Sequence, residues 1–119
     1  MVIPVERLGD VSAITVPVEE LDADNTPEFL QAIGPVLHAG TGVVLDLSRV
    51  RFVDSSGLGA LLVCLRTVQA RGGALKLCGL SRSAGAAFEL VRFHQLFDVR
   101  DTREEAVHAF APAALCARP

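Results

Sequence analysis

The chain has 119 residues, of which 50% are hydrophobic and 21% are charged, and its formal net charge is -3. This length suits one domain, and the apolar content is sufficient for a compact core, which argues against a disordered chain. No segment carries a basic stripe, so the electrostatic signature of a nucleic-acid-binding protein is missing. The longest apolar run is too short to span a bilayer, and no signal-peptide pattern opens the chain. We therefore expect a cytoplasmic protein with no membrane partner.

Cysteine spacing gives no sign of a metal site or a disulfide framework. Cys64, Cys78 and Cys116 are far apart in the sequence and match no C-x-x-C pattern. We expect the first two to be buried structural thiols. We predict neither a metal nor any other cofactor.

The first part of the chain predicts a β-hairpin followed by a helix. Residues 2–6 and 11–18 have strand character, with turn residues between them. The helix is expected to start near Thr26, which can cap it, with Pro27 in its first turn. Pro35 predicts a kink or an early end of this helix.

From residue 43 onward, strands are expected to alternate with helices, which is typical of an α/β layer. We expect strands at residues 43–47, 74–78 and 97–99, and helices over residues 58–68, over residues 84–91 and after a capping box at residues 102–105. The pattern predicts one domain over residues 1–110: a mixed sheet of four to five strands with about four α-helices packed against it. Residues 111–119 are expected to form a flexible tail.

The segment VVLDLSRVRFVDSSGLGALL, residues 43–62, is the most informative part of the chain. A buried strand leads through an apolar pair to Asp54, Ser55 and Ser56, where a helix is expected to begin. Asp54 or Ser55 can cap its first turn, and the dipole at a helix N-terminus favours negative charge. A phosphoryl group on such a serine would be tolerated locally and would add about -1.5 to -2 charges. An ordinary capping loop is the alternative interpretation of these residues alone.

The stretch DLSRVRFVDSSGLGALL resembles the signature of STAS domains of the anti-sigma factor antagonist family. Upstream, residues 20–23 (ELDA) resemble the family's G-E-L-D-A segment, and downstream, residues 72–75 (GGAL) resemble its usual strand entry. The resemblance covers residues 2–110 and implies the STAS fold. Two departures stand out: Glu19 replaces a glycine, and the helix before Phe97 lacks its usual C-terminal glycine, a place where His94 could adopt a left-handed conformation.

The resemblance implies a bacterial partner-switching protein. In that family, the serine directly after the aspartate is phosphorylated by a partner that is both anti-sigma factor and serine kinase, and here that residue is Ser55. The unphosphorylated antagonist binds the anti-sigma factor and frees a sigma factor for transcription in a stress response. Phosphorylation ends the binding, and a serine phosphatase restores it. The partner-binding residues implied are Asp22, Asp54, Ser55, Ser56, Gly57, Leu58 and Gly59.

An enzyme and a STAS adaptor are the two alternatives to this function. An enzyme is disfavoured because His38, His94 and His108 are remote from Ser55 in sequence and no G-x-S-x-G elbow or dinucleotide loop is present. A non-phosphorylated STAS adaptor in a lipid-transport or stressosome-type complex keeps the fold and changes the role. We expect a monomer, or a weak dimer through the edge of the first strand.

Overall fold

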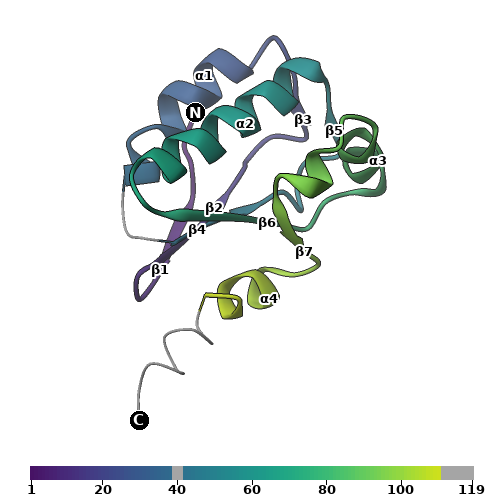
Figure 1. Cartoon of the computed structure of the whole chain (residues 1–119). Coiled ribbons are helices and arrows are strands. Elements are labelled where there is room, and N and C mark those ends of the chain that lie inside the picture. Colours follow the sequence, from purple (N-terminus) through teal and green to yellow (C-terminus); the bar gives the residue numbers. More distant parts are fainter. Residues whose placement is uncertain (39–41, 111–119) are drawn as a thin grey trace.

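A five-stranded mixed sheet forms the centre of the molecule, with helices on both faces (Figure 1). The computed structural model describes residues 1–38 and 42–110. The strand order is β1-β2-β4-β6-β7, with β1 antiparallel to β2 and each later pair parallel. The strands are β1 (Val5–Leu8), β2 (Val11–Thr15), β4 (Gly42–Asp46), β6 (Ala74–Cys78) and β7 (Asp98–Arg100). The prediction of a mixed sheet with about four helices is confirmed.

Three helices cover one face of the sheet: α1 (Thr26–Ile33), α2 (Ser55–Ala70) and α3 (Arg82–Leu90). Short 3-10 turns follow α1 and α3, η1 at Val36–His38 and η2 at Phe93–Gln95. The main core lies between these helices and the sheet, where Phe29, Leu61 and Phe88 are among its fully buried side chains. All five residues of β4 are buried, as expected for a central strand covered on both faces.

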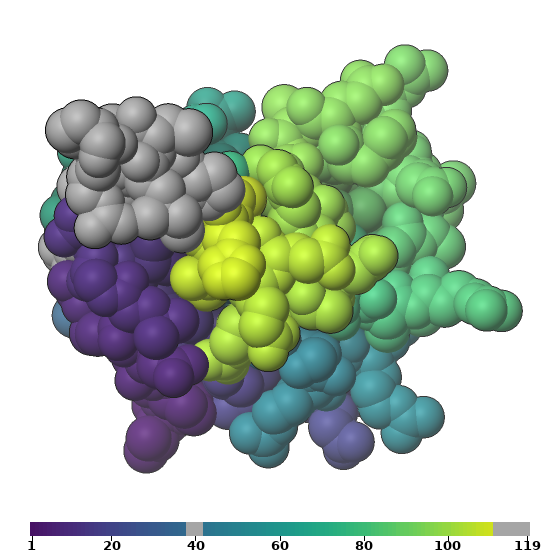
Figure 2. All heavy atoms as spheres, turned by 90° about the horizontal axis from the view of Figure 1, so that it is seen from below, coloured from purple at the N-terminus to yellow at the C-terminus, as the bar shows by residue number. Residues whose placement is uncertain are grey.

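The opposite face of the sheet is covered by the short helix α4 (Arg103–His108). Figure 2 shows α4, in yellow, lying beside the purple N-terminal segment. Ala106 of α4 packs with Val44 and Cys78 in a small second core. A Cβ on Gly42 would lie 3.0 Å from the Phe110 ring, so a larger residue there would press against this ring.

A separate two-stranded parallel sheet joins β3 (Glu20–Leu21) to β5 (Phe52–Val53). The sequence indicated the apolar pair of β5 but gave no strand signal at residues 20–21. A helix follows each of these strands: α1 follows β3 after a short turn, and α2 follows β5 after a single residue. The small sheet therefore brings the starts of two helices to the same end of the molecule.

Several predicted boundaries were wrong by a few residues. The first strand spans Val5–Leu8 rather than residues 2–6, and β2 ends at Thr15, before Pro17, which cannot donate to the ladder. Helix α1 ends at Ile33, before Pro35, which confirms the expected early end. The capping role given to Thr26 was also wrong: Asn25 holds the cap position, and the carbonyl oxygen of Asp22 accepts from the Asn25 and Thr26 amides.

The left-handed residue after α3 is Arg92, with φ of 61°, and not His94 as the sequence suggested. Arg92 follows Val91, the C-cap residue of α3, at the position where a glycine would most commonly stand. Cys64 and Cys78 are fully buried free thiols, as predicted, and burial raises the pKa of each to about 12. Cys116 and the expected tail, residues 111–119, lie outside the described residues.

Candidate functional site

Helix α2 begins at Ser55, and Asp54, one of the two caps that the sequence allowed, caps it. Asp54 has extended backbone geometry, and its Oδ1 accepts a hydrogen bond from the Gly57 amide at 2.9 Å. The Leu58 amide donates to the Asp54 carbonyl oxygen, also at 2.9 Å. The first bond satisfies one of the amides that a helix start leaves unpaired, and the second is the first regular hydrogen bond of the helix. Together they fix the orientation of the first turn.

Asp54 also ties this first turn to the turn between β3 and α1. Its Oδ2 accepts from the Ala23 amide at 3.3 Å, and its own amide donates to the Leu21 carbonyl oxygen at 3.2 Å. One residue therefore joins two loops that are about thirty positions apart in the sequence. Asp22, the second predicted acidic site residue, is thereby placed beside the start of α2.

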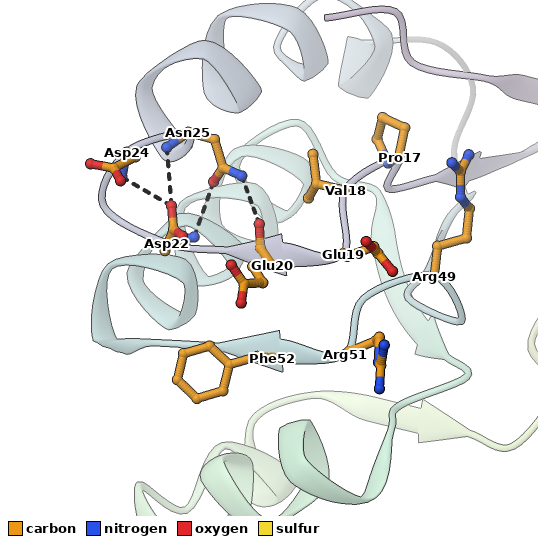
Figure 3. A pocket seen from close by; sticks show the side chains of 10 residues that line it. All are labelled: Pro17, Val18, Glu19, Glu20, Asp22, Asp24, Asn25, Arg49, Arg51 and Phe52. Atoms are coloured by element: carbon orange, nitrogen blue, oxygen red, sulfur yellow. Dashed lines mark hydrogen bonds between the residues drawn. The ribbon is translucent and has the colours of Figure 1, made fainter.

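The side chain of Asp22 builds the turn that it belongs to. Its Oδ1 accepts from the amides of Asp24 and Asn25 at 3.0 and 3.3 Å. Asn25 bonds back: its Oδ1 accepts from the Asp22 amide at 3.0 Å, and its Nδ2 donates to the Glu20 carbonyl oxygen at 2.6 Å (Figure 3). No role for Asn25 was predicted, although the D-x-D-N pattern is typical of turns and could have indicated one.

The backbone at Glu19 does not need the glycine that the family resemblance led us to expect. Arg92 is the only non-glycine residue of the described chain with a positive φ, so Glu19 needs no left-handed backbone. Its carbonyl oxygen accepts from the amides of Arg51 and Phe52, which continues the pairing of β3 with β5. This departure leaves the local pairing intact.

Gly57 allows α2 to approach the small sheet closely. A Cβ at this position would lie 2.7 Å from Cγ1 of Val53 and closer still to the carbonyl oxygen of Leu21. The latter atom is backbone that also accepts from Asp54, so it cannot move without disturbing the cap. Gly57 is therefore a structural requirement of the site.

The predicted site residues differ in their exposure. Ser55 and Gly59 are exposed, while Asp22, Asp54 and Ser56 are partly buried. Gly57 and Leu58 are buried, Leu58 at 8% exposure and within the main core. Gly57 and Leu58 thus shape the loop from beneath, and their role in partner binding stays a prediction.

The hydroxyl groups of Ser55 and Ser56 have no hydrogen-bond partner within residues 1–38 and 42–110. Ser55 is the more accessible of the two. Ser55 directly follows Asp54, whose carboxylate accepts from the amide of Ala23 in the turn that contains Asp22 and Asp24. The site thus combines an accessible hydroxyl, a rigid capped helix start and an acidic surround.

A cleft of about 930 Å³ continues from this site along the small sheet. It is lined by residues from segments 17–25 and 49–52, and Figure 3 shows their side chains. In the part of the chain that the structure describes, no group of three His, Cys, Asp or Glu residues is placed to hold a metal ion. None of the described helices is long and apolar enough to cross a membrane.

The STAS domain family matches the chain over residues 3–106. The chain belongs to this family. BtrV of Bordetella bronchiseptica, provisionally named an anti-sigma factor antagonist, is 37% identical over 71 residues, which are 60% of this chain and 61% of BtrV. The chain thus spans less than two thirds of that relative. The anti-sigma-B factor antagonist of Bacillus subtilis is 27% identical over 88 residues, which are 74% of this chain and 81% of that protein.

Solved structures of STAS proteins share the fold. An anti-sigma factor antagonist from Mycobacterium paratuberculosis has a TM-score of 0.79 at 27% identity, over 90% of this chain and 91% of the other. Unphosphorylated SpoIIAA has a TM-score of 0.75 at 23% identity, over 92% and 96% of the two chains, and its phosphorylated form has also been solved. The murine anion transporter Slc26a9 contains a domain with a TM-score of 0.73 at 25% identity, which covers 91% of this chain but 18% of the transporter.

Proposed function

We propose that this STAS protein is an anti-sigma factor antagonist whose switch is phosphorylation of Ser55. The observation that carries the proposal is the accessible, unbonded Ser55 hydroxyl at the capped start of α2. The antagonist names of its relatives, and the existence of a phosphorylated SpoIIAA, support the same role. In this role the protein works in the cytoplasm by binding, without catalysing a reaction.

In the unphosphorylated form, the exposed Ser55 and Gly59 would contact an anti-sigma factor with serine kinase activity. Asp22, Asp54 and Ser56 would contribute the partly buried margin of that contact. Binding would occupy the anti-sigma factor and free a sigma factor. A serine phosphatase would return the phosphorylated protein to this state.

The effect of phosphorylation follows from the charges at the site. A phosphoryl group brings about -1.5 to -2 charges, which the helix dipole and the free amides of the first turn tolerate locally. The group would stand beside the carboxylates of Asp54 and Asp22, so the contact surface would become strongly negative. A partner adapted to a neutral hydroxyl would then meet repulsion and a desolvation cost, while α2 itself would stay folded.

Substitutions at Ser55 test the switch. We expect Ser55→Asp to weaken binding to the cognate anti-sigma factor by at least about tenfold, which corresponds to about 1.4 kcal/mol. Ser55→Ala should bind like the unphosphorylated protein and should not be phosphorylated by the kinase. Titration calorimetry and mass spectrometry of the kinase reaction measure the two effects.

Ser83→Ala is the matched control, because Ser83 is an exposed serine on a different helix, α3. It should be phosphorylated and bound like the wild type. Equal affinity of Ser55→Asp and Ser55→Ala for the anti-sigma factor would contradict the switch model.

The adaptor role is the second candidate, and the observation that favours it is the part of the Slc26a9 transporter that shares this fold. An adaptor would bind a transporter or scaffold protein through the same fold. The affinity of an adaptor for its partner would not depend on the charge at position 55. Affinity capture with Ser55→Ala and with Ser55→Asp therefore separates the two roles: an adaptor is recovered with the same partners by both baits.

A further inference from the structure

The end of α3 leaves two neighbouring apolar side chains in water. Leu90 is the last residue of this helix and is 86% exposed, and Val91, its C-cap residue, is 47% exposed. Phe88, only two positions before Leu90, is buried in the main core. Of the three helices on this face of the sheet, α3 is the outermost, with α2 between it and α1 (Figure 1). Leu90 and Val91 therefore form an apolar surface at the margin of the molecule.

One acidic and one basic side chain flank this apolar pair. Glu89 precedes it, Arg92 follows it, and both are exposed. Neither side chain has a hydrogen bond or an ion pair within residues 1–38 and 42–110. The Arg92 amide donates to the Glu89 carbonyl oxygen at 3.1 Å, so the turn that ends α3 keeps both residues beside the apolar pair. The elements most in contact with α3 are β5, which carries no charged residue, and η2, which contributes His94.

The order of chemistries in this segment is complementary to itself. Along the chain, residues 89–92 (ELVR) run acidic, apolar, apolar, basic. A second copy turned by 180° presents the same order in reverse, which sets Glu89 of each copy against Arg92 of the other and the apolar pairs against each other. Such two-fold contacts, in which the same patch is used on both subunits, are the commonest form of self-association. The segment therefore fits a second copy of this chain, because each copy supplies the charge that the other lacks.

The edge of β1, the other candidate for a contact between copies, has charges that oppose one. A two-fold axis that extends the sheet stands perpendicular to it and leaves each side chain on its own face. Pairing along Val5–Leu8 then sets Glu6 opposite Glu6 or Arg7 opposite Arg7, and like charges directly opposite destabilise a strand pair. Glu6 and Arg7 also bond within the protomer, to Arg103 and Ser12. Self-association through this edge is thereby disfavoured.

We propose that residues 89–92 form a self-association surface through which two copies of this chain make a reversible two-fold dimer. The apolar pairs meet at the centre of the contact, and a Glu89–Arg92 ion pair closes it on each side. With four residues per copy at its centre, the contact is smaller than the standard of about 800 Å² per partner, so the dimer is weak and depends on concentration. The inference is independent of the proposed function, and the dimer carries two copies of the Ser55 site.

Sedimentation equilibrium of the full chain tests this surface, because the monomer has a mass of 12.6 kDa and the dimer twice that mass. We expect the wild type to be partly dimeric as its concentration rises to about 1 mM, and Leu90→Ser to weaken self-association at least about tenfold. Val2→Ser is the matched control, because Val2 is also 86% exposed but lies at the N-terminus, and it should dimerise like the wild type. A wild type that stays monomeric at about 1 mM, or equal dissociation constants for the two variants, would overturn the inference.

Charge variants test the two-fold pairing itself. Glu89→Arg and Arg92→Glu should each be monomeric, because each sets like charges against one another across the axis. An equimolar mixture of these two variants should form a heterodimer, in which both facing pairs are again of opposite charge. The double variant Glu89→Arg/Arg92→Glu should self-associate like the wild type. If the single variants dimerise fully, or if their mixture stays monomeric, the proposed pairing is wrong.

Arg66→Glu is the matched control for charge, at an exposed arginine of α2. Its dissociation constant should lie within about twofold of the wild-type value, because a surface charge outside the contact contributes little. Its mixture with Glu89→Arg should not reach the affinity of the Glu89→Arg and Arg92→Glu mixture. Thermal melting checks that every variant is folded. Recovery with Arg66→Glu as strong as with Arg92→Glu would reduce the effect to net charge and overturn the inference.

Discussion

Helix α2 contains two glycines, Gly57 and Gly59, and their surroundings differ. A Cβ at Gly57 would overlap the backbone of β3 and the side chain of Val53, so the close contact between α2 and the small sheet depends on its absence. Gly59 has no heavy atom within 4 Å of the position that a Cβ would take, and it is exposed. At residue scale, only the first of these glycines is required by packing.

We therefore expect Gly57→Ala to lower the free energy of unfolding by about 1–3 kcal/mol, the usual cost of overpacking. Gly59→Ala should be neutral or should raise it by about 0.5–1 kcal/mol, because alanine is the better residue in a helix interior. Urea unfolding of the two variants measures the difference. Equal destabilisation by both would contradict the packing argument.

The helix α4 illustrates what an ion-pair network does at the scale of one element. Arg103 donates from Nε to Asp46 at 3.0 Å, from Nη1 to Glu6 at 3.0 Å and from Nη2 to the Thr15 hydroxyl at 2.6 Å. Its three partners lie on three neighbouring strands of the sheet. A helix of six residues has little intrinsic stability, so this side chain and the small apolar contact around Ala106 hold it in place.

Removing Arg103 should let α4 open more often and expose Cys78 beneath it. In a Cys116→Ser background, we expect Arg103→Ala to increase the labelling rate of Cys78 by about tenfold, because hydrogen bonds to charged groups are each worth about 1.5 kcal/mol or more. Cys64, under the helices of the other face, should keep its slow rate. Thiol trapping with mass spectrometry follows both cysteines in the same sample.

Arg82→Ala on α3 serves as the control and should leave both labelling rates unchanged. An equal acceleration of Cys64 and Cys78 in Arg103→Ala would indicate global unfolding instead of a local opening of α4. In that case α4 would not be a separable element.

At the scale of the whole molecule, two carboxylates favour the folded state above acidic pH. The Arg100 guanidinium, together with the Lys76 ammonium, lowers the pKa of Asp98 from 3.8 to about 2. For Asp46, burial acts to raise the pKa, but hydrogen bonds from Ser48 and Arg103 outweigh it and the pKa is lowered. In both cases the carboxylate binds a proton more readily in the unfolded chain than in the folded one. The two carboxylates therefore stabilise the fold above about pH 3.8, and this stabilisation is lost as the pH falls through their folded-state pKa.

Stability should therefore fall between pH 4 and pH 2, and Asp98→Asn should make this fall shallower. The Asp98 side chain is 35% exposed, so solvent screening limits its contribution at neutral pH to about 1 kcal/mol. Chemical unfolding at several pH values measures the slope. Asp101→Asn, at an exposed carboxylate without an ion pair among the described residues, should keep the wild-type slope.

The local sequence was sufficient for the elements whose signal is short-ranged. The apolar run of residues 74–78 predicted β6 to the residue, and the capping potential of Asp54 and Thr102 predicted the starts of α2 and α4. These features depend on side chains and amides that are three or four positions apart, so the chain carries the information locally. The signature D-S-S-G-L-G likewise indicated the family before any fold was known.

The tertiary structure decided the features that join distant segments. No local pattern marks Glu20 and Leu21 as a strand. These two residues form a strand only because they pair with Phe52 and Val53. The burial of Leu58 depends on α1 and the sheet, and the bond from Ala23 to Asp54 spans 31 positions. The sequence by itself determined which helix start carries the serines. Folding decided which of these residues are exposed, because exposure depends on what other parts of the chain cover.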